Sequence, residues 1–328
     1  MTKLPILPSG GSDASTGDEV RYPSILNDVI GPVMRGPSSS HCAAAVRIGL
    51  LARALMDGEM TEVLVEFHPT GSLATTHESQ GSDMGLFGGL LGWDATDDRL
   101  VDSPRAIRAA GIETEIRITE FPASHPNTYR ITLRHGAEEH RMTALSLGGG
   151  MIRVVEVDGV ALSMEGDYHE TLLFLAGSGV AEVGRVLEEG GVHADSIQEL
   201  SGPEQALTQI KSQDPIPPET LSRLLAIPQV LSVRTLPPVL PVQSRVDMQA
   251  PFLSATQMEA FALQVEKDGA QSLPLWRLAA AYESQRGGIS EEEVLARMVE
   301  IVEILETSLQ TGLAGTEYED RILEAQVG

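Results

Sequence analysis

The sequence predicts an α+β protein built from a mixed domain, a ferredoxin-like unit and a C-terminal helical tail. Up to about residue 155, segments with strand alternation and segments with helical spacing follow one another without a repeating order. Between residues 171 and 236 the predicted order becomes β-α-β-β-α-β. A long amphipathic helix is then predicted by an apolar stripe of Val294, Met298, Ile301, Leu305 and Leu309.

Composition suggests where these parts begin and end. The first 22 residues are rich in Pro, Gly, Ser and Asp, which predicts a disordered leader. Pro237, Pro238 and Pro241 open a predicted linker. The expected parts are a leader (1–22), a mixed domain (23–157), a ferredoxin-like domain (158–240), a linker (241–272) and a helical segment (273–328).

Individual elements follow from periodicity and turn residues. A helix is expected after His41, with a serine of the preceding triplet as its N-cap. Ser290 and Glu293 form a capping box for the tail helix, which is expected to end at Gly312. The other expected elements are strands 63–67 and 112–119, a hairpin of 127–134 and 138–145 turning at Gly136, a helix at 86–91, and, in the second unit, strands 171–176, 193–200, 205–212 and 230–236 with helices after 180 and 218.

Charge and cysteine content exclude several classes of protein. The chain has 47 acidic and 23 basic residues and a net charge of -24, which disfavours nucleic-acid binding. The single cysteine, Cys42, excludes internal disulfides, thiolate zinc sites and a self-contained iron–sulfur cluster. Neither a membrane span nor a signal peptide is expected, so the predicted location is the cytoplasm.

The triplet before the first long helix is the strongest candidate for a binding site. Unpaired N–H groups at a helix start attract anions, so Ser38, Ser39, Ser40 and His41 could together hold a carboxylate or a phosphate. The same residues are also consistent with an ordinary serine cap beside a surface histidine.

A second candidate is the polar loop from Gly71 to Asp83, which lies between a predicted strand and a predicted helix. Asp83 is expected to cap the helix that starts at Met84. His77 beside Glu78 is a candidate acid–base pair.

Other chemistries find less support. A Ser-His-Asp hydrolase is disfavoured because no G-x-S-x-G motif is present. The histidines are scattered without metal-ligand spacing, so no metal site is expected in this chain. Pyridoxal phosphate chemistry needs a suitable lysine, and Lys3, Lys211 and Lys267 lie in the leader or in polar segments.

The residues of both loops resemble a known family. Gly31-Pro-Val-Met-Arg-Gly-Pro-Ser-Ser-Ser-His41 is similar to the I-G-P-S-S-S-H-T signature of the β chain of iron–sulfur-dependent L-serine dehydratase (L-serine ammonia-lyase). Residues 71–83, followed by Gly88-Gly-Leu-Leu-Gly-Trp-Asp94, resemble that family's second loop and its continuation. The ferredoxin-like unit resembles an ACT domain, and residues 290–315 resemble the opening helix of the family's α chain.

The resemblance implies a subunit that helps convert L-serine, or a similar amino acid, to pyruvate and ammonia. It implies a [4Fe–4S] cluster in a partner α chain, whose iron would act as a Lewis acid on the substrate hydroxyl. An oligomer with that partner is expected, with no activity of this chain alone and no certain catalytic residue in it. The residues implied to face the substrate are Ser38, Ser39, Ser40, His41, Thr76, Gln80, Ser82 and Asp83.

Three positions depart from the family pattern. The usual threonine after the signature histidine is Cys42, for which a packing role is predicted. Gln80 replaces a histidine of the second loop and cannot shuttle a proton. The possible ligand loop of the ACT-like unit, formed by Gly177, Ser178 and Gly179, lacks an acidic or amide residue, so a ligand site and an assembly module are equally expected.

The sequence therefore favours a β-type subunit of an iron–sulfur L-serine ammonia-lyase. Two alternatives stay open. One is an amino-acid sensor without catalysis, and the other is a lyase for a different β-substituted amino acid.

Overall fold

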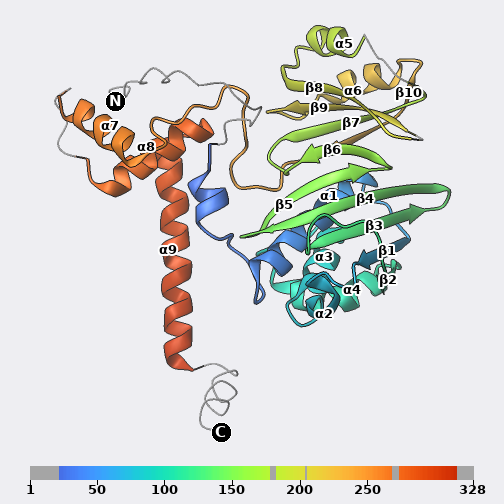
Figure 1. Ribbon diagram of the computed structural model, residues 1–328, viewed down its shortest axis with the longest axis horizontal. Coiled ribbons are helices and arrows are strands. Elements are labelled where there is room, and N and C mark those ends of the chain that lie inside the picture. Colours follow the sequence, from blue (N-terminus) through green and yellow to red (C-terminus); the bar gives the residue numbers. More distant parts are fainter. Residues whose placement is uncertain (1–21, 178–181, 204, 268–272, 316–328) are drawn as a thin grey trace. The chain divides into compact units, whose positions relative to one another are not determined.

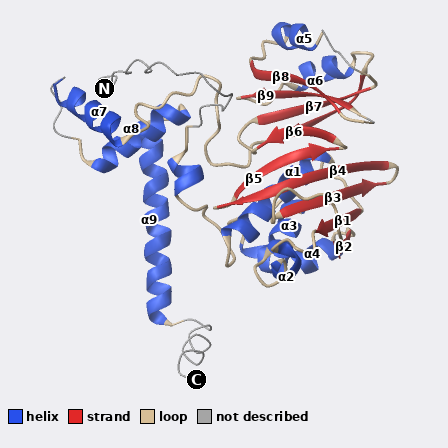
Figure 2. Ribbon diagram, viewed as in Figure 1, coloured by secondary structure: helices blue, strands red, loops and turns tan. Residues whose placement is uncertain are grey.

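The computed structural model describes residues 22–177, 182–203, 205–267 and 273–315. These residues form two compact units. Residues 23–247 hold both β-sheets, whereas Tyr22 and the described residues from 248 onward form a helical unit (Figure 2). The predicted leader lies outside the described residues apart from Tyr22. The predicted α+β chain with C-terminal helices is confirmed.

The first sheet has six strands in the order β2-β1-β3-β4-β5-β6 (Figure 1). Strands β1 and β2 are parallel, and the other neighbours are antiparallel. The predicted hairpin is formed by β3 and β4 and turns at Gly136, which has a φ of +59°. The strands are β1 (Glu62–Phe67), β2 (Glu113–Ile118), β3 (Thr128–His135), β4 (Glu138–Gly148), β5 (Met151–Val157) and β6 (Val160–Met164).

Strand β6 extends this sheet beyond residue 157, where the sequence places the end of the first domain. Asp158 and Gly159 join β5 to β6, and both have positive φ angles, +49° and +76°. Two successive residues at positive φ make the tight turn that suits the twist of a hairpin, and Asp-Gly is the sequence signal for it.

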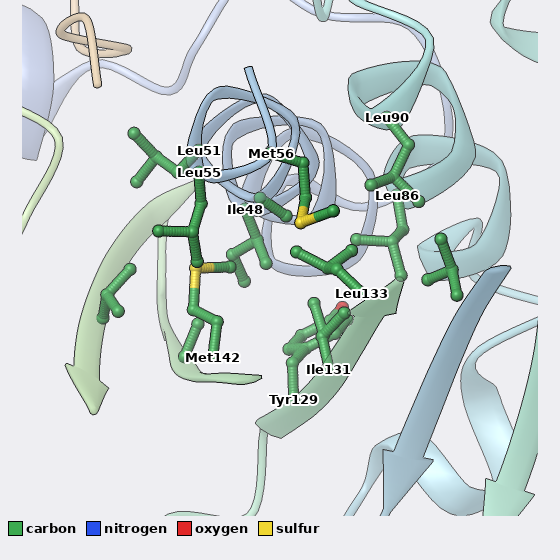
Figure 3. Close-up of a cluster of buried hydrophobic side chains, with 14 of the residues drawn as sticks. Ile48, Leu51, Leu55, Met56, Leu86, Leu90, Tyr129, Ile131, Leu133 and Met142 are labelled. Carbon is green, nitrogen blue, oxygen red and sulfur yellow. The ribbon is translucent and has the colours of Figure 1, made fainter. Parts of the chain in front are cut away.

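Helices α1 (Ala44–Leu55) and α3 (Ser82–Leu90) pack against this sheet (Figure 3). Leu51 and Leu55 of α1 and Leu86 of α3 belong to the same buried cluster as Ile131 and Leu133 of β3. The remaining helical segments of this part are Ile25–Val29, Ser39–Ala43, α2 (Leu73–Thr76), Asp98–Asp102 and α4 (Ser103–Ala109).

Glycines allow α1 and α3 to cross with their backbones nearly touching. A Cβ atom on Gly49 of α1 would lie 2.5 Å from the carbonyl oxygen of Leu86 and 2.9 Å from the Cα of Gly89. A Cβ atom on Gly89 of α3 would overlap the carbonyl oxygen of Val46. Glycine inside a helix costs stability, about 0.5–1 kcal/mol relative to alanine. Here it permits a separation that no other residue allows.

The second sheet has the order β10-β7-β9-β8, with every neighbouring pair antiparallel. Its elements follow the predicted order β-α-β-β-α-β. Leu172 and Phe174 face the core of the first sheet, whereas Leu173 and Leu175 pack with the two helices. The elements are β7 (His169–Leu175), α5 (Val183–Glu189), β8 (Ala194–Ser201), β9 (Ala206–Ser212), α6 (Pro218–Leu225) and β10 (Val230–Leu236).

The helical unit contains α7 (Ala255–Lys267), α8 (Leu275–Gly287) and α9 (Glu291–Ala314). Helix α7 lies in the segment predicted as a linker. It forms because Phe261 and Val265 are buried against Leu278 and Ala281 of α8. The prolines that predicted a linker carry no information about this contact.

Helix α9 begins as predicted, because the Ser290 side chain accepts a hydrogen bond from the Glu293 N–H at 3.1 Å. It continues beyond Gly312, the predicted end, and stops at Gly315, which has a φ of +90°. Along its apolar stripe Val294 is buried, whereas Leu305 and Leu309 are exposed. Among the described residues, no helix is long and apolar enough to cross a membrane.

We expect Gly89→Ala to lower the free energy of unfolding by about 1–3 kcal/mol, because the added methyl group meets backbone atoms that cannot move aside. Gly184→Ala is the matched control, since Gly184 lies in α5 with nothing within 4 Å of the new atom. That substitution should stabilise the chain by about 0.5–1 kcal/mol. Urea unfolding of the three proteins measures both effects, and equal stability of Gly89→Ala and wild type would contradict the crossing.

Candidate functional site

The serine triplet starts the first long helix, but not through the side-chain cap that the sequence predicts. Ser38 has an extended backbone (φ -144°, ψ 121°), and its carbonyl oxygen accepts the Cys42 N–H at 2.7 Å. Its hydroxyl makes no bond to a backbone N–H. The side chain instead lies 3.0 Å from Nδ1 of His41. The imidazole therefore replaces the backbone as the partner of this serine.

His41 links the two candidate loops. Its Nδ1 lies 3.0 Å from the Ser38 hydroxyl and 3.2 Å from that of Ser40, and its Nε2 lies 3.0 Å from the Thr76 hydroxyl. Thr76 in turn donates to the carbonyl oxygen of Ser72 at 2.6 Å. Residues separated by more than thirty positions are thus joined in one hydrogen-bonded chain.

This chain of bonds determines the protonation of His41. The Thr76 hydroxyl has one hydrogen and donates it to Ser72, so Thr76 accepts from Nε2 of His41. In a neutral imidazole Nδ1 then carries a lone pair, which accepts from the serine hydroxyls. Burial lowers the pKa of His41, which favours the neutral ring. The result is a neutral base that faces two hydroxyl groups.

The second loop contains an acid–histidine pair that differs from the predicted one. Nδ1 of His77 lies 2.8 Å from Oδ1 and 2.9 Å from Oδ2 of Asp83, whereas no bond joins His77 to Glu78. Helix α3 begins one residue before Asp83, so this carboxylate lies in the first turn and does not cap the helix. Burial raises the pKa of Asp83, and the bond from His77 opposes that shift.

Cys42 lies where the two loops meet. Its side chain is fully buried, and Sγ donates to the carbonyl oxygen of Gln80 at 3.2 Å. A Cβ atom on either Gly36 or Gly81 would overlap Sγ, and both glycines have positive φ angles of +97° and +84°. Burial raises the pKa of this thiol, so it stays protonated. The thiol holds the loops together, consistent with the packing role predicted for it.

The remaining predicted residues do not join the chain of bonds. Ser82 is fully buried, and its hydroxyl lies near the buried hydroxyl of Tyr129. Neither hydroxyl has a partner at standard hydrogen-bond geometry among the described residues, so this pair is at most a weak bond. Gln80 contributes a backbone oxygen, and no side-chain bond is found for it or for Ser39 in the described part of the chain.

Several residues that support the site are not among those predicted from the sequence. The Ser146 hydroxyl donates to the carbonyl oxygen of Ser40 at 2.7 Å and ties the triplet to β4. The Ser72 hydroxyl donates to Asn127. Tyr129 stacks edge to face with Phe67, with ring centroids 5.3 Å apart. Each partner lies more than fifty positions away in sequence, and no local pattern signals such a contact.

The described residues do not provide a metal or cluster site. No group of three or more His, Cys, Asp and Glu side chains is placed to hold a metal ion in the described ranges. The single thiol is buried, protonated and bonded to Gln80. An iron–sulfur cluster therefore does not fit this chain. Of the possible ligand loop in the second unit, Gly177 is described and exposed, and Ser178 and Gly179 lie outside the described residues.

Fold and site together define a class: an α+β protein whose polar site is built by two loops at helix starts, with no group of metal ligands in the part of the chain that the structure describes. Over 219 residues the chain is 35% identical to the probable L-serine dehydratase, beta chain, of Bacillus subtilis (strain 168), a match that covers 65% of this chain and 98% of that protein. Over 148 residues it is 34% identical to the L-serine dehydratase, beta chain, of Peptoniphilus asaccharolyticus, covering 44% and 66%. No protein-family model matches. The chain belongs to the L-serine dehydratase β-chain family.

The lowered pKa of His41 predicts how stability depends on pH. The folded chain binds this proton less readily than the unfolded chain, whose histidine has a pKa near 6.5. As the pH falls below that value the unfolded chain takes up the proton first, so the free energy of unfolding decreases.

We expect His41→Gln to flatten this decrease between pH 7 and 5, because the substituted side chain does not titrate. His193→Gln is the control, because this side chain is 86% exposed and takes no part in the His41 hydrogen bonds; the flattening should be larger for His41→Gln than for this variant. Urea unfolding at several pH values gives the slopes, and identical slopes for His41→Gln and wild type would refute the assignment.

Proposed function

We propose that this chain is the β-type subunit of an iron–sulfur-dependent L-serine ammonia-lyase and acts with an α chain that holds a [4Fe–4S] cluster. The family supports this proposal, because both relatives are named as beta chains of L-serine dehydratase. The single buried thiol also supports it, since a cluster needs several thiolates. The observation that carries the proposal is the hydrogen-bonded chain through His41, which joins the two motif loops.

We assign the serine hydroxyls to the substrate carboxylate. Both are half-exposed, so a ligand can reach them without unfolding the loop. They share a single lone pair on Nδ1 of His41, so only one can donate to it at a time. The two hydroxyls also lie 3.2 Å apart, so the other one donates either to its neighbour or to an anion, for which the start of the helix is electrostatically suited.

His41 has two possible tasks in this arrangement. It orients the hydroxyls, because its own tautomer is determined by Thr76. As a neutral base it also accepts a proton that reaches it through a serine hydroxyl. The His77–Asp83 pair lies on the same loop as Thr76, and we assign it to holding that loop in shape, together with Ser82 and the backbone of Gln80. Ser39 completes the half-exposed triplet.

The second sheet with α5 and α6 is proposed to be an ACT-type module. Its β-α-β-β-α-β order and its strand order β10-β7-β9-β8 support this. Its close packing onto the first sheet, through Leu172, Phe174, Leu207 and Leu236, favours a role in assembly. The alternative role is ligand binding at the 177–179 loop, which is supported by the exposure of Gly177.

The test is anaerobic formation of pyruvate from L-serine. This chain alone should give none, and the complex with its α chain should give turnover. In the complex, His41→Gln should lower kcat/KM by about 10²-fold or more, as loss of a proton-transferring group does. Ser38→Ala should mainly raise KM, because carboxylate binding contributes equally before and during the reaction.

Arg108→Gln is the matched control, because Arg108 is exposed in the last turn of α4, away from both loops. It should stay within about twofold of wild type. Turnover by this chain alone, or full activity of His41→Gln, would overturn the proposal. If an intact, cluster-loaded complex does not deaminate L-serine but deaminates another β-substituted amino acid, the proposed substrate is wrong and that amino acid replaces it.

A further inference from the structure

A cavity with mixed polar and apolar walls lies beside α1 and uses none of the residues of the proposed serine site. Its volume is about 790 Å³, within the range of small-molecule sites. One wall is formed by α1, and the others by residues 92–95, by Pro32 and Val33, and by the stretch that follows β10. All of these residues belong to the unit 23–247.

Two arginines of α1 line this cavity, and neither forms a close ion pair with a carboxylate of the described residues. The Arg47 residue is 6% exposed, and its guanidinium donates to the carbonyl oxygen of Gly150 at 2.5 Å. Arg53 donates to the carbonyl oxygen of Leu90 at 3.0 Å. Neither guanidinium lies within 4.0 Å of a carboxylate of the described residues, although most arginines there form such pairs.

The two acids at this cavity offset the charge of the arginines without contacting them. Asp57 is 61% exposed and pairs with Arg234 at 3.3 Å, an arginine that Glu138 also contacts. Asp94 is exposed, its Oδ1 accepts the N–H of Ala95 at 2.8 Å, and its charge acts on Arg47 from beyond ion-pair distance. The donors of Arg47 and Arg53 are therefore not occupied by a carboxylate of the described residues.

Burial makes this charge costly. It lowers the pKa of Arg47 to about 10, and the nearby Asp94 opposes the shift only in part. The side chain is still protonated at pH 7. A buried charge that is only partly compensated is unfavourable, and walls rich in proline and aliphatic side chains strengthen its attraction for an anion.

The geometry also holds Arg53 in place. A Cβ atom on Gly92 would lie 3.2 Å from Nε of Arg53, and one on Gly58 would lie 3.1 Å from its terminal nitrogen. Both glycines have positive φ angles, +79° and +84°. The guanidinium thus packs between two turns, which fixes the direction of its donors before any ligand arrives.

We propose that the cavity lined by Arg47 and Arg53 binds a small oxyanion, a carboxylate or a phosphate, at a site separate from the Ser38–Asp83 loops. Arginine suits such a ligand because its planar donors match two oxygens at once. A bound anion would connect α1 with residues 237–241, which follow the last strand of the second sheet. Ligand binding here would therefore stabilise the contact between the two sheets.

Titration calorimetry of the full chain at constant ionic strength tests this, with inorganic phosphate and succinate as probes and neutral succinamide as a control for size. One site should be filled by phosphate or by succinate, and the preferred probe identifies the group. Succinamide should not bind. Arg53→Gln should weaken binding by about tenfold or more, the usual value of a hydrogen bond to a charged group.

Arg108→Gln makes the same change of charge outside the cavity and should bind like wild type. Val33→Trp adds bulk at the rim from a side chain that is 36% exposed, and it should weaken binding without removing a charge. It also tests the site if Arg53→Gln does not fold. Binding of neither anion, or equal binding by wild type and Val33→Trp, would overturn the proposal. None of these measurements uses serine turnover, so failure of this proposal can be distinguished from failure of the proposed function.

Discussion

The close crossing of α1 and α3 is the constraint on which the site depends. Gly49 and Gly89 let the two backbones meet, and Gly85 lies so near the carbonyl oxygen of Cys42 that a side chain would not fit. Two helices that cross in this way bring the loops before them together as well. The thiol of Cys42 fills the remaining space between Gly36 and Gly81, so the loops are held by packing and not by a covalent link.

This packing gives the polar residues their chemistry. A histidine next to serines in sequence does not by itself indicate a defined protonation state. The state becomes defined because Thr76 accepts a hydrogen bond from Nε2 of His41. The threonine determines the tautomer, and burial keeps the ring neutral. A site with hydroxyl donors and a neutral base is compatible with the proposed subunit, which would act together with a partner chain. Membership of the β-chain family agrees with that role.

The sequence predicted the features that local patterns encode. The hairpin of β3 and β4, the order of elements in the second sheet and the cap at Ser290 follow from residues close in sequence. The motif loops were identified through their resemblance to a family. Pairing within the loops was not predictable, because Asp83 reaches His77 only once α3 starts at Ser82. Helix α7 was missed since its stability comes from burial of Phe261 against α8.

Packing of the two loops sets the protonation of His41, and the imidazole nitrogens of this residue report it directly. Long-range ¹⁵N–¹H NMR of the histidine rings, with the His41 signals assigned by their loss in His41→Gln, distinguishes the two tautomers. The structure predicts a neutral ring at pH 7.5 with the proton on Nε2 and an unprotonated Nδ1. A proton on Nδ1, or a ring protonated on both nitrogens at that pH, would contradict it.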